Sequence, residues 1–177
     1  HDMRGPDDPV EITDEATPIK IGNMVYVCSP HQIVFALDAA TGRQVWRFDP
    51  HLLVNPTFQH LTCRGVSYAA TPVPPATVEA GGQGGAVAPQ ACAERIFLPT
   101  NDGRLMALDA QTGQLCPAFG NKGVIDLTEG MPMRVLGFYE PTSPPVVTDR
   151  LVIISGAVTD NYSTHEPSGV TRAYDLY

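Results

Sequence analysis

The chain has 177 residues, with 11 Lys and Arg, 19 Asp and Glu, and a formal net charge of −8 at pH 7. This shortage of cations argues against a nucleic-acid partner, because such surfaces contact phosphates through clustered Lys and Arg, and it favours a neutral or weakly charged small substrate. The 16 Gly and 17 Pro divide the sequence into short apolar runs, which is typical of an all-β protein, and no run approaches the roughly 20 apolar residues of a membrane span.

The beginning of the chain predicts one four-stranded antiparallel meander. Short runs rich in Val, Ile and aromatic residues alternate with Gly, Pro, Asn and Asp, which favour turns. We predict strands at 17–21, 24–28, 33–38 and 43–48. A meander of this size corresponds to one blade of a β-propeller, and we assign the first blade to residues 11–50.

One phrase occurs twice, as ALDAATGRQVW at 36–46 and ALDAQTGQLCP at 107–117, and a third copy begins at 173. In the first copy, Asp38 and Thr41 are suited to bond turn amides, and Gly42 is suited to a positive φ. Trp46 offers a flat surface on which a neighbouring unit packs. The phrase therefore predicts a repeat architecture of β-hairpins.

Two further meanders follow the first. The second blade is assigned to residues 63–119, with strands predicted at 63–68, 95–99, 104–109 and 114–119. Residues 69–90 are mostly Ala, Pro, Gly and Val, and we interpret them as a surface loop inserted into this blade. The third blade, 140–177, has strands predicted at 144–147, 151–155 and 170–175 and lacks a fourth. We therefore interpret residues 1–177 as part of a propeller domain, a fragment of a longer chain.

The four cysteines are Cys28, Cys63, Cys92 and Cys116. They lack Cys-x-x-Cys spacing, which argues against a zinc site. Two disulfides in any of three pairings agree with the sequence, and so do four buried free thiols. Disulfides would indicate an oxidising compartment.

Three polar residues precede the first strand of the three meanders: Glu15, Arg64 and Thr142. The innermost strands of a propeller line its central channel, so we expect these side chains to meet around one ligand. The forked donors of Arg64 suit a carboxylate or quinone oxygen. The alternative is that the three are unrelated surface residues.

Further candidates lie near these positions. His60 is suited to act as a base, a proton shuttle or a donor to substrate, and the alternative is a solvated loop residue. Ser155 and Gly156 end an apolar strand with small side chains, which permits a flat ligand, or a covering loop, to approach closely. Asp160 and Asn161 offer oxygen ligands, but two residues do not make a metal site, and we assign no metal ligand. The motifs of serine hydrolases, P-loop proteins, dinucleotide enzymes and zinc proteases are absent.

Longer strings carry a resemblance to a known family. The phrase at 36–46 resembles the tryptophan-docking repeat of quinoprotein (PQQ-dependent) alcohol and sugar dehydrogenases. Four strings resemble the membrane-bound quinoprotein glucose dehydrogenases in particular: DEATPIK at 14–20, FQHLTCRGVSY at 58–68, YEPTSPP at 139–145 and VTDNYST at 158–164.

The resemblance implies an eight-bladed propeller, of which this chain supplies part. It implies pyrroloquinoline quinone on the propeller axis with a divalent metal, Mg or Ca, beside it. The implied reaction oxidises an aldose at C1, D-glucose to gluconolactone, and passes the electrons to ubiquinone. The implied location is the periplasm, with a tether to the inner membrane in a segment absent from this sequence.

The resemblance also implies roles for individual residues. The cofactor would be contacted by Glu15, Arg64 and Thr142, and it would have Ser155 and Gly156 nearby. His60 would face the sugar substrate. The acidic base and the cofactor-contacting lysine of the family belong to later blades. We assign no catalytic residue to this chain, and we expect it to be inactive as a separate fragment.

Two departures and two alternatives accompany this assignment. Pro117 stands where the second docking tryptophan would be, so that blade should be fastened differently. Val158 replaces an acidic metal ligand of the soluble quinoprotein alcohol dehydrogenases, which argues against metal binding here. The alternatives are a quinate, shikimate or polyol dehydrogenase and a non-catalytic propeller scaffold. Exposed blade edges should pack on the rest of the propeller or on a second copy.

Overall fold

The computed structural model describes residues 5–9, 11–55, 58–70, 91–131, 135–159 and 164–176. Every regular element in these ranges is a β-strand, and the strands form three antiparallel sheets and one separate two-stranded pair. The all-β prediction is confirmed. Within the same ranges, no helix has the length and apolar character that a membrane crossing requires.

Blade 1 is the sheet formed by β1 (Ile19–Ile21), β2 (Met24–Cys28), β3 (Val34–Asp38) and β4 (Gln44–Phe48). Each strand pairs with the next one along the chain, so the sheet is a simple meander. The prediction of these four strands is confirmed, with small differences at their ends.

Blade 2 contains β5 (Ser67–Ala70), β6 (Glu94–Thr100), β7 (Arg104–Asp109) and β8 (Val124–Asp126). The first strand begins later than predicted and includes two residues that were assigned to the inserted loop. Residues 71–90, the rest of that predicted loop, lie outside the described residues.

The predicted fourth strand of blade 2, at 114–119, is wrong. This segment makes only an isolated bridge between Leu115 and Leu108 of β7, and the fourth strand is β8 instead. Pro117 has no amide hydrogen to continue a ladder, and the neighbouring Cys116 is joined to Cys92. The chain therefore turns away after the bridge and returns to β7 only at β8.

Blade 3 contains β10 (Val146–Val147), β11 (Leu151–Ile154) and β13 (Arg172–Asp175), paired in the order β10-β11-β13. The three predicted strands are confirmed. A separate pair, β9 (Tyr139–Glu140) with β12 (Ala157–Val158), was not predicted. It joins the segment that enters blade 3 to the segment that follows β11.

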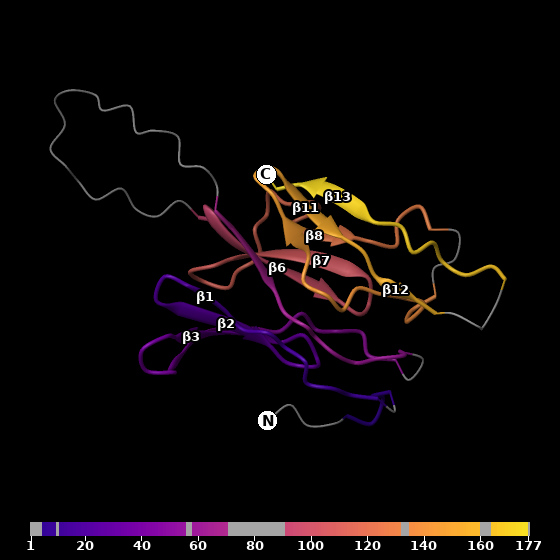
Figure 1. Cartoon of the computed structure of the whole chain (residues 1–177), viewed down its shortest axis with the longest axis horizontal. Helices are drawn as coiled ribbons and strands as arrows, with labels where there is room; N and C mark the ends of the chain where they lie inside the picture. Colours follow the sequence, from indigo (N-terminus) through magenta and orange to yellow (C-terminus); the bar gives the residue numbers. More distant parts are fainter. Residues whose placement is uncertain are drawn as a thin grey trace, which may run out of the picture.

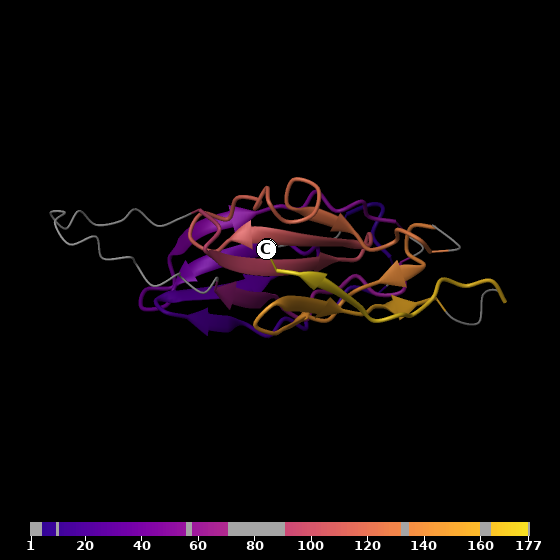
Figure 2. The same cartoon turned by 90° about the horizontal axis from the view of Figure 1, so that it is seen from above.

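Blade 2 lies between the other two blades. Figure 1 shows the sheets succeeding one another, from indigo blade 1 at the bottom to yellow β13 at the top. The turned view in Figure 2 shows the strands running mostly along the long axis of the molecule. One buried cluster combines apolar side chains of blades 1 and 2, and the other combines those of blades 2 and 3.

Trp46 fastens blade 1 to blade 2. Its indole N–H donates to the Ala110 carbonyl at 3.0 Å, and Tyr26 donates to the same carbonyl at 3.1 Å. A Cβ added to Gly113 would lie 2.6 Å from Trp46 Cε3, so the ring packs against this glycine. Trp46 of the first phrase therefore packs on the turn of the second, as predicted.

Arginines connect blade 2 to blade 3, where the phrase has Pro117 in place of tryptophan. The buried Arg95 guanidinium donates to the carbonyl of Leu176. Arg172 donates to the carbonyls of Leu127 at 2.7 Å and Glu129 at 2.9 Å. These bonds from guanidinium to backbone are the different fastening that Pro117 predicted.

The cysteines form two disulfides, so the free-thiol alternative is wrong. Cys28 pairs with Cys63, and Cys92 pairs with Cys116. The first bond joins β2 of blade 1 to the residue directly before Arg64. The second lies within blade 2. The Cys28–Cys63 bond therefore anchors the segment that carries a predicted site residue.

Candidate functional site

The segments that enter the three blades run side by side. Ile12 and Leu61 form a parallel bridge between the first two segments. Farther along, the Thr17 amide donates to the Arg64 carbonyl at 3.0 Å, and the Arg64 amide donates to the Thr142 carbonyl at 3.0 Å. Backbone pairing across successive blades therefore brings these entry positions to one end of the sheets.

The side chains of Glu15, Arg64 and Thr142 meet there and form what we name the Arg64 cluster. Arg64 Nε donates to Glu15 Oε2 at 2.7 Å, and Arg64 Nη1 donates to Thr142 Oγ1 at 2.9 Å. The three are therefore not unrelated surface residues. They come from segments that precede three different blades.

The opposite charges of Arg64 and Glu15 are paired, and both side chains remain partly exposed to solvent. The hydrogen bond from Arg64 and a second one from the Thr13 hydroxyl lower the pKa of Glu15. The Arg64 and Glu15 side chains are 45% and 39% exposed. Within the described residues Arg64 uses only Nε and Nη1, so its outer donors remain available to an oxygen acceptor.

His60 lies four residues before Arg64, and its ring faces Glu11 of the segment that enters blade 1. Its Nε2 is 3.9 Å from Glu11 Oε1, and 43% of its side chain is exposed. The hydrogen bonds from Arg64 and Thr13 and the charge of Arg64 do most to lower the Glu15 pKa, and a smaller electrostatic contribution comes from His60. The ring is therefore accessible and close to the Arg64 cluster.

Ser155 and Gly156 lie directly before β12, and Thr142 follows β9. Since β9 and β12 are antiparallel, these positions share one end of the pair. Ser155 is exposed. A Cβ on Gly156 would lie 2.8 Å from Tyr139 Cζ, so within this chain Gly156 makes room for the flat Tyr139 ring.

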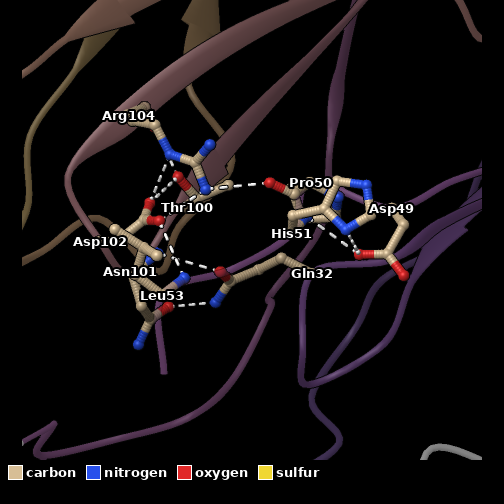
Figure 3. Close-up of polar contacts among 9 residues, drawn as sticks. All are labelled: Gln32, Asp49, Pro50, His51, Leu53, Thr100, Asn101, Asp102 and Arg104. Carbon is tan, nitrogen blue, oxygen red and sulfur yellow. Dashed lines mark hydrogen bonds and ion pairs between the residues drawn. The ribbon is translucent and has the colours of Figure 1, made fainter. Parts of the chain in front are cut away.

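Three buried polar residues near His60 were missed by sequence reasoning: Gln32, Asn101 and Glu140, which are 1%, 0% and 2% exposed. Gln32 follows β2 and Asn101 follows β6, so they occupy corresponding turns of blades 1 and 2. Figure 3 shows these two side chains facing one another. Their equivalence in the repeat was a signal that could have revealed them.

The described residues offer little for a metal ion. They contain no group of three or more His, Cys, Asp or Glu side chains suited to hold one. Asp160 and Asn161 lie outside the described residues. An open hollow of about 700 Å³ is lined by other residues, from 5–8, 31, 33, 49, 51–54 and 136, and includes no member of the Arg64 cluster.

Comparison with known proteins identifies a family. Residues 1–177 match the family described as "PQQ: Glucose/ethanol/alcohol dehydrogenase, beta-propeller domain". The chain is 50% identical over 99% of its length to the quinoprotein glucose dehydrogenase of Escherichia coli K12. It is 52% identical over 99% of its length to the quinoprotein glucose dehydrogenase of Gluconobacter oxydans. In both cases it spans only 21% of the relative's length.

The names of less similar relatives indicate other substrates. The chain is 37% identical to the glycerol dehydrogenase large subunit of Gluconobacter thailandicus, over 91% of this chain and 20% of that protein. It is 35% identical to the quinate/shikimate dehydrogenase (quinone) of Acinetobacter baylyi, over 92% of this chain and 20% of that protein.

The fold has solved counterparts. The crystal structure of quinohemoprotein alcohol dehydrogenase from Comamonas testosteroni superposes with a TM-score of 0.63 at 23% identity, over 96% of this chain and 20% of that chain. At this identity the likeness concerns the fold alone. Together with the family match, it confirms the prediction that the sheets are propeller blades.

Proposed function

This chain belongs to the β-propeller family of PQQ-dependent glucose, ethanol and alcohol dehydrogenases, and from that premise we propose that it is part of a quinoprotein glucose dehydrogenase. The observation that carries the proposal is the Arg64 cluster, which unites charged and polar side chains from three blade entries. A propeller scaffold without a ligand has no need of such a group at the end of its sheets.

The donors of the cluster fit pyrroloquinoline quinone, whose carboxylate and carbonyl oxygens are acceptors. Arg64 presents an accessible guanidinium, and the hydrogen bond to Glu15 fixes its plane. Thr142 Oγ1 accepts from Arg64, so its hydroxyl hydrogen remains for donation to a bound group. Glu15, Arg64 and Thr142 would therefore hold the cofactor, and Ser155 and Gly156 would border it.

The bound cofactor supplies the two-electron acceptor that oxidation of a sugar hydroxyl requires. The residues of this chain would bind the cofactor and the sugar and orient them relative to each other. The accessible His60 ring, close to the cluster, would face the sugar and bond one of its hydroxyl groups. We assign the acidic base and the ligands of the divalent metal, Mg or Ca, to parts of the protein outside this chain.

Identity favours an aldose as substrate. The two glucose dehydrogenases share 50% and 52% of their residues with this chain, whereas the glycerol and quinate/shikimate enzymes share 37% and 35%. We therefore propose oxidation of D-glucose to gluconolactone with ubiquinone as the electron acceptor. The second candidate is oxidation of a polyol or of quinate, which the two less similar relatives support.

The disulfides favour an oxidising compartment. Both Cys28–Cys63 and Cys92–Cys116 connect segments of the blades, and such bonds persist in the bacterial periplasm rather than in the cytosol. We propose a periplasmic location, with a tether to the inner membrane supplied by another part of the protein.

The experiment is a substrate comparison with the complete gene product. The protein is loaded with pyrroloquinoline quinone and Mg or Ca, and kcat/KM is measured for glucose, glycerol and quinate with a ubiquinone analogue. We expect glucose to be preferred by about tenfold or more. A preference for glycerol or quinate would support the second candidate function instead. Absence of cofactor-dependent oxidation would overturn both candidate functions.

A further inference from the structure

A short strap, residues 59–62, carries His60 and leads into Arg64. On either side of His60, the residues Phe58 and Leu61 are 3% and 0% exposed and anchor the strap in the apolar interior. Between these anchors, Gln59 and His60 are held by polar contacts instead. The orientation of the His60 backbone therefore depends on hydrogen bonds.

Glu140 of β9 supplies two of these bonds. Its Oε1 accepts the Gln59 amide at 2.8 Å, and its Oε2 accepts the His60 amide at 3.3 Å. One carboxylate thus spans two consecutive amides. Burial raises the pKa of Glu140, while the bonds from Gln59 and His60 act in the opposite direction because they favour the ionised form.

Asn101 and Gln32 hold the strap from the other blades. Asn101 Nδ2 donates to the His60 carbonyl, and Gln32 Nε2 donates to the Thr62 carbonyl at 3.0 Å. The two residues also fix each other, because the backbone N–H of Asn101 donates to Gln32 Oε1 at 3.0 Å (Figure 3). The N–H and the C=O of His60 are therefore bonded to buried side chains of different sheets.

We propose that Glu140 is a positioning residue that fixes His60 against the substrate site. The inference rests on the proposed function for the identity of the cofactor and the substrate. The bonds from the strap to Glu140 and Asn101, which we name the clamp, are contacts of the structure itself. Glu140 acts on the strap through the backbone amides of Gln59 and His60, and Asn101 supports His60 through its carbonyl.

The alternative is that Glu140 serves only to keep the chain folded. Phe58 and Leu61 argue against this alternative, because they keep the strap attached to the interior when Glu140 is altered. Loss of the clamp should then free the peptide around His60 without releasing the strap. A positioning role and a purely structural role therefore predict different values of kcat per bound quinone.

The test compares Glu140→Gln with the control Glu129→Gln in the complete dehydrogenase. An amide has one acceptor oxygen, so the first variant bonds only one of the two strap amides. Glu129 is exposed, and its substitution changes the charge equally without touching the strap. Measurements are hydrogen exchange of the amides of Gln59 and His60, and kcat and KM for glucose normalised to bound quinone.

We expect Glu140→Gln to exchange these amides about tenfold faster or more, and to lower kcat per bound quinone by about 10- to 100-fold. KM should change less than kcat, and Glu129→Gln should match the wild type. A purely structural role would reduce the amount of loaded enzyme but leave kcat per bound quinone unchanged. Wild-type exchange and wild-type kcat in Glu140→Gln would overturn the proposal.

A second variant covers the case in which Glu140→Gln does not fold. Asn101→Ala removes the side-chain donor to the His60 carbonyl on the opposite side of the peptide, and it should produce the same loss of kcat per bound quinone. Unchanged kcat there would overturn the proposal. A wild-type enzyme that binds no quinone would instead overturn the proposed function, while the exchange comparison would still test the clamp.

Discussion

At the residue scale, the repeated phrase builds the same turn in two different environments. Asp38 Oδ1 accepts the Thr41 amide at 2.8 Å, and Asp109 Oδ1 accepts the Thr112 amide at 2.9 Å. The turn chemistry was therefore predictable from the first phrase alone. The contact with the neighbouring blade differs between the two turns, because only the second turn packs against the Trp46 ring.

The turn glycines provide a matched pair for testing that difference. Gly42 and Gly113 have φ of 71° and 72°, so alanine is strained at both. At Gly113 the new Cβ would also lie 2.6 Å from Trp46 Cε3, whereas Gly42 has nothing within 4 Å. We expect Gly113→Ala to lose about 1–3 kcal/mol more stability than Gly42→Ala.

Urea unfolding of the complete protein measures this difference. The fluorescence of Trp46, which is the one tryptophan of this chain, should change only in Gly113→Ala after the other tryptophans of the protein are replaced. Equal losses in the two variants would show that Trp46 does not pack on the second turn.

Glu15 gives a prediction about pH. The bond from Arg64 is the largest cause that lowers its pKa below the ordinary 4.5. A carboxyl with a lowered pKa contributes stability above its unfolded pKa and loses it as pH falls through the folded value. We expect Glu15 to titrate below 4.5 by carboxyl ¹³C NMR, and Arg64→Gln to raise its pKa. An unchanged titration in Arg64→Gln would contradict the pairing.

The candidate site was predictable only in part. Glu15, Arg64 and Thr142 were found because corresponding positions of a repeat meet at one end of its sheets. Glu140 was not found, because its partners are two backbone amides of an irregular strap. Periodic patterns predict strands, but they do not predict the path of such a segment.

At the element scale, the exact boundaries of the strands matter less than how the blades are joined. The meander of blade 1 followed from alternation and turn residues, whereas β8 was missed because Pro117 and the Cys92–Cys116 bond divert the chain. The pair of β9 and β12 was missed because each strand has only two residues. Long-range pairing of such short segments leaves little signal in sequence.

The disulfides provide a test at this scale. Cys28–Cys63 has a sequence separation of 35 and directly precedes Arg64, whereas Cys92–Cys116 has a separation of 24 and lies within blade 2. Replacing either pair by alanine should cost about 3–4 kcal/mol. Only the Cys28/Cys63 double variant should also weaken quinone binding, because it releases the segment that carries Arg64.

Chemical denaturation and quinone titration of the two double variants check this expectation. The Cys92/Cys116 variant is the control, since it removes a comparable loop constraint without altering the Arg64 segment. Equal quinone affinity in both variants would contradict the view that Cys63 helps to place Arg64.

At the scale of the whole molecule, blade 3 exposes apolar side chains. Val146, Leu151 and Val170 are 63%, 38% and 43% exposed. The chain spans about a fifth of the length of its curated relatives, 21% for the E. coli enzyme. We infer that these side chains pack on the next blade of the complete propeller, and that blade edges in the separate chain favour self-association.

Val146→Asp tests this inference. In the complete protein the substitution should lower the free energy of unfolding by about 1–3 kcal/mol, because it would place an unpaired charge in a blade interface. In the separate chain it should reduce self-association without lowering stability. Sedimentation and urea unfolding measure the two effects, and an unchanged stability of the complete protein would show that Val146 faces solvent there.

Titration of the complete apoprotein with pyrroloquinoline quinone shows whether the Arg64 cluster holds the quinone. Arg64→Gln should weaken binding by about 10- to 100-fold, because a charge-assisted bond is lost. The control is Arg47→Gln, since Arg47 bonds Asp49 at 2.9 Å away from the cluster. We expect this control to bind the quinone like the wild type, whereas wild-type affinity in Arg64→Gln would show that the Arg64 cluster does not hold the quinone.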